Sequence, residues 1–123
     1  MTKDIFDNGM KVRREVLGEQ HVDKAESKKD EFTTEFQSLI TQYAWGEIWT
    51  RPGLERKTRS CITLAMMIAL HREDEFKLHI KAALTNGLTK NEIKEVILQS
   101  AIYAGVPAAN SAFHWAQDVF DNS

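Results

Sequence analysis

The sequence predicts an all-α fold, with one domain of about six helices spanning residues 1–123. Three observations support this. Apolar residues recur at helical spacing along most of the chain, residues typical of helix starts and stops separate these segments, and no segment alternates as a strand does. A chain of 123 residues also suits one domain, and it contains no internal repeat or long linker that would divide it.

The first predicted helix has its apolar face on residues such as Ile5, Val16 and Leu17 and ends at Gly18. The next segment, residues 19–30, is polar and charged, with few apolar anchors. We therefore expect a surface loop there.

A second helix is predicted over residues 32–43, where apolar side chains occur at i, i+4, i+7, i+8 and i+11 from Phe32. Residues 45–53 follow, with two tryptophans and an arginine before Pro52-Gly53. Because proline followed by glycine stops a helix, we expect this segment to be a turn-rich connection.

The third predicted helix, residues 55–70, is apolar on nearly every side from Cys61 onward, so we expect other helices to surround it. The fourth, residues 75–85, has Asp74 as its expected cap and stops at Asn86-Gly87.

The last two predicted helices have recognisable starts. Thr89 and Glu92 have the spacing of a capping box at the beginning of the fifth helix, which stops near Gly105. Pro107 suits the first turn of the sixth helix.

Composition limits the possible functions. Hydrophobic residues make up 42% of the chain and charged residues 28%, and the formal net charge is −2, which gives no electrostatic reason to expect nucleic acid or membrane as a partner. The longest apolar run, residues 61–70, is too short to span a bilayer, and residues 1–4 lack a signal-peptide pattern, so we expect a cytoplasmic protein. The single cysteine, Cys61, allows no internal disulfide and is expected to pack as a small hydrophobe.

One candidate acid/base pair lies on the fourth helix. Glu75 and His79 are four residues apart, so their side chains sit one turn above the other. At 100° per residue, His79 lies about 60° and Glu75 about 100° from Phe76 in the apolar stripe. This places the pair on the shoulder of the buried face, where a cleft residue would lie. The alternative is an ordinary surface ion pair.

Metal binding is not expected. His71, Glu75 and His79 fall at i, i+4 and i+8, which spans about 12 Å along a helix axis, too far for three side chains to converge on one ion.

Arginine binds carboxylates bidentately, so arginines are the candidates for holding an anionic ligand. Arg51, between Trp49 and Pro52, is the first choice, and Arg13 and Arg14 are further candidates. The tryptophans, among them Trp45, have a structural interpretation as core or subunit contacts and a functional one as a pocket wall.

Several segments together resemble the 4-carboxymuconolactone decarboxylases. They are residues 43–54 (YAWGEIWTRPGL), 56–60 (RKTRS), 75–79 (EFKLH), 82–87 (AALTNG) and 103–110 (YAGVPAAN), with 13–18 (RREVLG) and 21–23 (HVD) near the start of the chain. The resemblance covers nearly the whole chain. It implies an all-helical domain of alkylhydroperoxidase D-like fold that assembles into a homo-oligomer, a trimer or a hexamer.

The same superfamily includes peroxidase-type members with a Cys-x-x-Cys-x-x-x-His motif. When their histidine is aligned with His79, the two cysteine positions fall on Arg72 and Glu75, and their upstream glutamate falls on Ser60. Both thiols are therefore missing, and Cys61 lies off the motif, so thiol redox activity is not expected.

The reaction that the resemblance implies is decarboxylation of 4-carboxymuconolactone to β-ketoadipate enol-lactone in protocatechuate catabolism. The substrate's unsaturated lactone accepts the electrons released with carbon dioxide, so the implied reaction needs no cofactor and no metal. Two carboxylates must be held, and the ring carbon beside the carbonyl must be protonated.

Under this hypothesis His79 donates the proton and Glu75 orients it or keeps it protonated, while the reverse assignment remains open. Arg51 is expected to hold the acetate arm, because a tight grip on the departing carboxylate would stabilise the ground state. Two other interpretations also remain: a related enzyme acting on another lactone or keto acid, and a helical oligomerisation module without catalysis.

Overall fold

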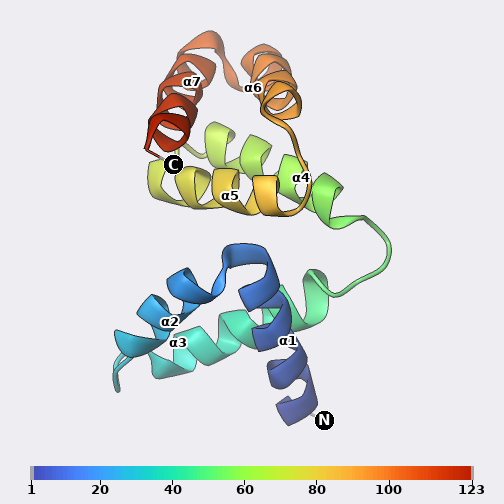
Figure 1. The fold of residues 1–123 in the computed structure, drawn as a ribbon, viewed down its shortest axis with the longest axis vertical. Coiled ribbons are helices and arrows are strands. Elements are labelled where there is room, and N and C mark those ends of the chain that lie inside the picture. The colour runs from blue at the N-terminus through green and yellow to red at the C-terminus, as the bar shows by residue number, and fades with distance from the viewer. Residues whose placement is uncertain (1, 123) are drawn as a thin grey trace. The chain divides into compact units, whose positions relative to one another are not determined.

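The computed structural model describes residues 2–122, and in this range the chain forms seven α-helices, one π-helical segment and no strand (Figure 1). The prediction of an all-α fold is confirmed, whereas the helix count of about six is too low. The α-helices are α1 (Thr2–Leu17), α2 (Glu19–Ser27), α3 (Thr34–Ile40), α4 (Arg56–Ala69), α5 (Glu73–Thr85), α6 (Lys90–Ala104) and α7 (Val106–Asp121), and the π-helix η1 (Thr41–Ile48) continues α3.

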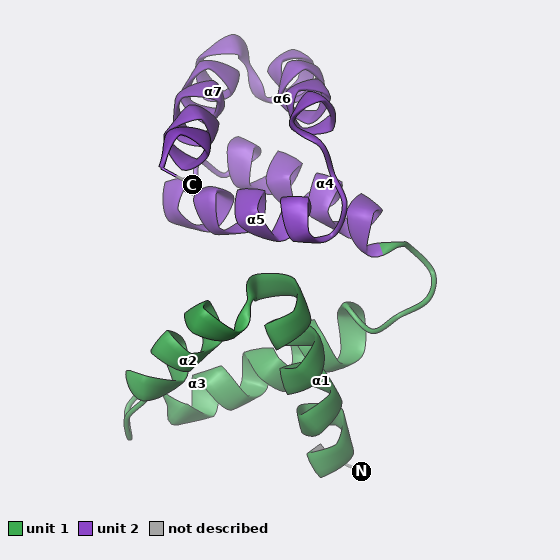
Figure 2. Cartoon of the chain, viewed as in Figure 1, with its two compact units in different colours: residues 1–55 green, residues 56–123 purple. Residues whose placement is uncertain are grey.

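The chain divides into two compact units, residues 1–55 and 56–123 (Figure 2). The first contains α1, α2, α3 and η1, and the second contains α4 to α7. Within residues 2–122, no helix combines the length and the apolar character needed to cross a membrane.

In the first unit, α1 packs closely against η1 because two glycines lie at the contact. A Cβ atom on Gly9 would collide with the carbonyl oxygen of Thr41 and lie 2.8 Å from the Gly46 nitrogen. A Cβ on Gly46 would lie 2.6 Å from the Ile5 carbonyl oxygen. Only glycine fits at both positions while the helices keep this distance.

The surface loop predicted for residues 19–30 is wrong over most of its length, because residues 19–27 form α2. Gly18, with φ of 92°, turns the chain after α1, and the new helix then buries Val22 completely. Arg14 of α1 also forms an ion pair with Asp23 of α2, in which Nη1 donates to Oδ1 at 2.7 Å. These contacts stabilise a short polar helix that the sequence pattern of residues 19–27 does not predict.

The turn-rich connection predicted for residues 45–53 begins later than expected. Residues 45–48 continue the helix as part of η1, and the Trp49 N–H donates to the Ala44 carbonyl oxygen five residues back at 2.9 Å. The buried Trp45 ring stacks on Trp49, with centroids 5.1 Å apart, which favours the extra helical turn. The chain leaves helical structure only at residue 49, before Pro52-Gly53.

The predicted helix over residues 32–43 is largely confirmed by α3 and η1, but most of its apolar stripe is exposed. Buried residues are absent from α3 as described. We use the name α3 stripe for four exposed apolar side chains on and beside α3: Phe32 before the helix, Phe36 and Leu39 in it, and Tyr43 in η1.

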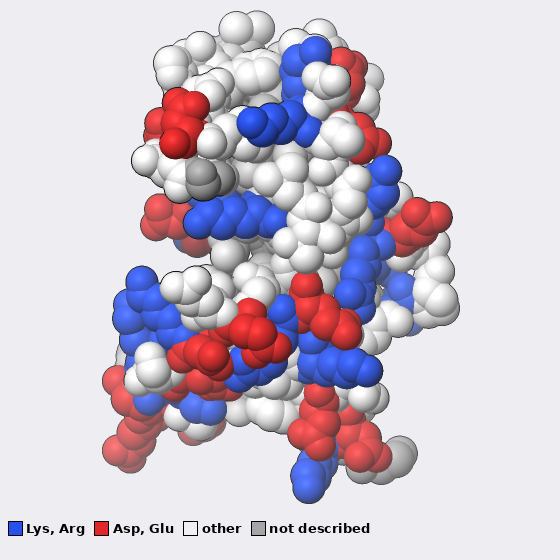
Figure 3. Space-filling view, in the orientation of Figure 1, with Lys and Arg blue, Asp and Glu red and all other residues white. Residues whose placement is uncertain are grey.

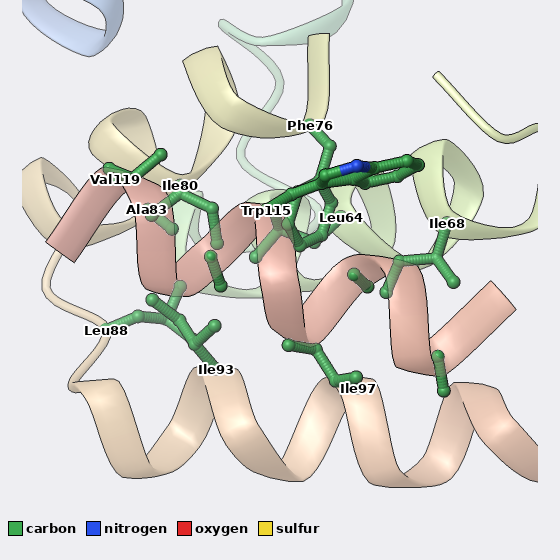
Figure 4. Close-up of a cluster of buried hydrophobic side chains, with 13 residues drawn as sticks. Leu64, Ile68, Phe76, Ile80, Ala83, Leu88, Ile93, Ile97, Trp115 and Val119 are labelled. Carbon is green, nitrogen blue, oxygen red and sulfur yellow. The ribbon is translucent and has the colours of Figure 1, made fainter. Parts of the chain in front are cut away.

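The second unit consists of two helical hairpins, α4–α5 and α6–α7, which pack on each other through α4 with α6 and α5 with α7. Apolar side chains from all four helices and from Leu88 meet between the hairpins (Figure 4). Trp115 lies against Phe76 there, with ring centroids 5.8 Å apart. This core fixes α5, the helix that carries the candidate acid/base pair.

The prediction that helices surround α4 on every side is wrong within the described residues. Leu64 and Ile68 are completely buried, but Ile62, Met66 and Leu70 are exposed. The other three helices of this unit pack on one side of α4, so an apolar face remains uncovered in the single chain.

The predicted boundaries of the last three helices are mostly confirmed. α5 starts at Glu73, so Asp74 lies in its first turn and is not the cap. Gly87, with φ of 102°, follows α5 as predicted. The capping box of Thr89 and Glu92 is present at α6, and Pro107 lies in the first turn of α7.

Charged side chains of both signs are interspersed on the visible face of the first unit, and the visible face of the second unit has wide areas without charge (Figure 3). Neither visible face carries a large patch of one sign, which agrees with the small net charge.

Candidate active site

The helix α5 places Glu75 and His79 at the edge of the core of the second unit. Phe76, Ile80 and Ala83 are completely buried, whereas Glu75 and His79 are half-buried. The Nδ1 atom of His79 is inaccessible to solvent. The position on the shoulder of the buried stripe is therefore as the helical spacing predicts.

The Glu75 carboxylate is held by Arg72, the residue just before α5. Arg72 Nε lies 2.9 Å from Glu75 Oε1, and Nη2 lies 3.4 Å from Oε2. This two-point hydrogen bond is the main reason why the pKa of Glu75 is lower than usual, and the charge of His79 contributes in the same direction. Glu75 is therefore stabilised as a carboxylate.

A partly buried hydrogen bond links the end of α5 to α4. The side-chain amide of Asn86 donates to Ser60 Oγ at 2.9 Å, and Ser60 is completely buried. Ser60 is the position that aligns with a glutamate of the redox members, so here a neutral contact between two helices occupies that place.

Arg13 and Arg14, two of the candidate carboxylate-binding residues, are engaged within the first unit. Arg13 is buried and donates from Nη1 to Thr41 Oγ1 at 3.3 Å and from Nη2 to Gln37 Oε1 at 3.2 Å. Burial lowers the pKa of Arg13. Arg14 bonds Glu19 and Asp23, which raise its pKa.

Arg51 and Trp45, the other two candidates, lie on either side of the end of η1. Trp45 is buried in the first unit, in agreement with its structural interpretation as a core residue. Arg51 is exposed, and its backbone N–H donates to the Ile48 carbonyl oxygen at 3.0 Å, which fixes the main chain at that point. Of the four residues, Arg51 is the exposed one, since Arg14 is half-buried and Arg13 and Trp45 are buried.

A groove of about 560 Å³ lies between α4 and α6, away from α5. Its walls include Cys61, Ile62, Val96 and Tyr103, and its acidic residues are Glu92 and Glu95. A wall of apolar side chains and two carboxylates does not suit a dicarboxylate ligand. Cys61 packs against the core, and its pKa is raised mainly by burial, as expected of an unreactive thiol.

Among residues 2–122, no group of three histidine, cysteine, aspartate or glutamate side chains is arranged to hold a metal ion. His71, considered above with Glu75 and His79, lies outside α5 in a left-handed conformation with φ of 59°. Its ring meets Trp115 edge-on at 5.1 Å.

Sequence reasoning gave Arg72 no role. Its i, i+3 spacing from Glu75 is a signal that could have identified the pair, since residues three apart on a helix are neighbours. The signal was weak because Arg72 precedes the predicted start of the helix.

Comparisons with known proteins identify a family and several relatives that this chain resembles. The Carboxymuconolactone decarboxylase family profile matches residues 34–118, a range that includes Trp45, Arg51, Glu75 and His79 but not Arg13 or Arg14. The 4-carboxymuconolactone decarboxylase of Acinetobacter baylyi is 50% identical over 115 residues, which is 94% of this chain and 86% of that protein.

Two further relatives are informative. Nitrosuccinic acid decarboxylase npaB of Metarhizium robertsii is 44% identical over 108 residues, covering 88% of this chain and 76% of that protein. The 4-carboxymuconolactone decarboxylase of Pseudomonas putida is 49% identical over 45 residues, 37% of this chain and 94% of that protein.

Proposed function

The chain belongs to the carboxymuconolactone decarboxylase family, and we propose that it acts as a carboxy-lyase on 4-carboxymuconolactone, with the second unit supplying the proton donor. The observation that carries this proposal is the 50% identity over 94% of the chain to a decarboxylase of that substrate. The product is β-ketoadipate enol-lactone, and the pathway is protocatechuate catabolism.

The reaction begins with loss of the carboxylate on the ring carbon next to the ring oxygen. The electrons of the broken bond move through the ring double bond into the lactone carbonyl, which gives an oxyfuran-like dienolate. Because the substrate supplies its own electron sink, the protein has to hold the carboxylates, stabilise the oxyanion and protonate carbon.

We assign proton donation to His79, with Glu75 as its anionic neighbour. Histidine suits this role because it exchanges its proton around neutral pH. The contact between Arg72 and Glu75 favours this assignment over the reverse one, since it keeps Glu75 ionised and without a proton to give.

Arg51 is the proposed contact for the acetate arm of the substrate. It is exposed, lies on a backbone fixed by the Ile48 hydrogen bond and falls inside the range that the family profile matches. Arg13 is buried, Arg14 is half-buried, and both lie outside that range, so they are secondary choices, and Trp45 contributes through packing.

A decarboxylation assay tests the proposal. 4-Carboxymuconolactone is generated in situ from 3-carboxy-cis,cis-muconate by its lactonising enzyme, and turnover is followed spectrophotometrically. We expect His79→Ala to lower kcat by about 10²- to 10⁴-fold, the usual contribution of general acid catalysis. His114→Ala is the matched control, because His114 is exposed on α7 and has no role in the proposal. Full activity of His79→Ala would disprove the assignment.

A second candidate substrate is nitrosuccinic acid, on which the Metarhizium robertsii relative acts according to its name. Its nitro group can accept the electron pair released with carbon dioxide, so the demands on the protein are the same: hold a carboxylate, stabilise a delocalised anion and protonate carbon. The two functions are separated by kcat/KM on both substrates, and we expect the lactone to be preferred.

We further propose that the two units work as one domain and that the chain forms a homo-oligomer, a trimer or a hexamer, in the cytoplasm. The exposed α3 stripe and the uncovered face of α4 support the assembly, because exposed apolar patches on a soluble protein mark interaction surfaces.

A further inference from the structure

We propose that Arg72 is a positioning residue for this decarboxylation: its guanidinium fixes the Glu75 carboxylate beside His79, so that His79 donates the proton. The inference deepens the proposed function and rests on it. Arg72 acts through Glu75 and needs no contact with substrate.

The geometry of the contact supports a positioning role. The guanidinium meets the carboxylate through two nitrogens, with Nε at 2.9 Å from Oε1 and Nη2 at 3.4 Å from Oε2. A two-point contact between planar groups limits rotation of the carboxylate, which a single ammonium group cannot do.

The backbone around Arg72 is fixed from both sides. Its N–H donates to the Met67 carbonyl oxygen at 2.9 Å, and its own carbonyl oxygen accepts from the Phe76 N–H at 2.9 Å. His71, just before it, is held in a left-handed conformation with its ring against Trp115. A non-glycine residue keeps such a conformation only where its surroundings enforce it.

The contact contributes little to folding stability, because the Arg72 side chain is 61% exposed and the Glu75 side chain 42% exposed. Its effect falls on the protonation state of Glu75. Arg72 is the largest cause of the lowered pKa of Glu75, so Glu75 is ionised throughout the range in which histidine exchanges its proton. The charge of His79 also lowers the pKa of Glu75, so the two side chains interact electrostatically.

Other charged groups lie near this contact, and the charge of Asp74 contributes to raising the pKa of Arg72. On α5 itself, Lys77 pairs with Glu73 and with Asp118 of α7. α4 has no charged residue after Arg59. The remaining charged or titratable residues on α5 and α7 are Asp74, Lys81, His114 and Asp121.

The test compares Arg72→Gln and Arg72→Lys with wild type by steady-state kinetics across pH. We expect Arg72→Gln to lower kcat by about tenfold to hundredfold with little change in KM, because an ill-placed catalytic group costs rate more than binding. In the pH profile of kcat, the fall in activity at low pH (the acid limb) should also move to higher pH, because the pKa of Glu75 rises towards the ordinary value of a glutamate. Arg72→Lys should return the acid limb to its wild-type pH, because lysine keeps the positive charge. Its maximal kcat should stay below that of wild type, because lysine cannot make the two-point contact.

The matched control is Lys77→Gln, which removes exposed ion pairs from the same helix without touching Glu75. It should leave both kcat and the acid limb unchanged. A raised KM with an unchanged acid limb in Arg72→Gln would overturn the proposal, since Arg72 would then be binding substrate directly.

A second measurement is independent of activity. In protein with ¹³C-labelled glutamate carboxyl groups, NMR titration should give a higher Glu75 pKa in Arg72→Gln than in wild type. If wild type does not turn over the lactone but this pKa rises, the proposed function fails while the contact stands. An unchanged Glu75 pKa would refute the inference itself.

Discussion

At the scale of single residues, arginines that the sequence does not distinguish have different roles, because their burial and hydrogen-bond partners differ. Arg13 is buried and donates to Thr41 and Gln37, so it links α1 to α3 and η1. Arg51 is exposed after η1. The same side-chain chemistry therefore serves packing in one case and, as proposed, substrate binding in the other.

This difference predicts opposite outcomes for two substitutions. Arg13→Met should lower the free energy of unfolding by about 1–3 kcal/mol, because the buried Thr41 hydroxyl and the half-buried Gln37 amide lose their donor, and should leave KM unchanged. Arg51→Ala should change the free energy of unfolding by less than about 1 kcal/mol, because Arg51 is exposed. It should raise KM by roughly tenfold or more, the value of a hydrogen bond between charged groups. Urea denaturation and steady-state kinetics of both variants measure this. A raised KM in Arg13→Met at unchanged stability would reverse the assignment.

The pH dependence at Glu75 follows from the sign of its pKa shift. Because its pKa is lowered in the folded state, the contact with Arg72 favours the folded state above the unfolded pKa of the carboxyl group. That contribution is lost as the pH falls through the lowered folded pKa.

At the scale of elements, the pairing of α1 with η1 depends on backbone approach at Gly9 and Gly46. Helix propensity alone would favour alanine at Gly9 by about 1 kcal/mol. The collision of an added Cβ with the Thr41 carbonyl oxygen outweighs that gain, because main-chain atoms held in two helices cannot move aside as a flexible side chain can.

Gly9→Ala is therefore expected to lower the free energy of unfolding by about 1–3 kcal/mol, the usual cost of overpacking, as measured by urea or thermal denaturation. Gly53→Ala serves as the control, because an added Cβ at Gly53 meets nothing within 4 Å. Equal stability of the two variants would contradict the close contact between α1 and η1.

At the scale of the whole molecule, apolar surface remains exposed on both units. The α3 stripe lies on the first unit, and Ile62, Met66 and Leu70 lie on the second. Since this surface lies in the open in a single chain, we expect assembly with further copies.

Leu39→Asp, in the α3 stripe, should shift the protein towards smaller species in size-exclusion chromatography with light scattering, while the far-UV circular dichroism stays helical. A buried charge opposes association, and Leu39 is exposed in the single chain, so folding is not affected. Gln20→Asp makes the same charge change at an exposed site of α2 and should leave the assembly intact. If Leu39→Asp has the same mass as wild type, this surface is not the interface.

The sequence by itself determined the all-α class, the starts of α6 and α7 and the shoulder position of Glu75 and His79. These features depend on local rules: helical periodicity, the Thr89 and Glu92 capping box, and the suitability of Pro107 for the first turn of a helix. The family resemblance added the reaction, because specific motifs carry information that periodicity lacks.

Only the tertiary structure decided the rest. The helix α2 forms because Val22 is buried against the rest of the first unit. The π-helix η1 extends through Trp45 because that ring stacks on Trp49. Arg13 became a packing residue through partners 24 and 28 positions away in the chain. Such contacts join residues that no local pattern relates, and their energies exceed the small helical preferences of the segments involved.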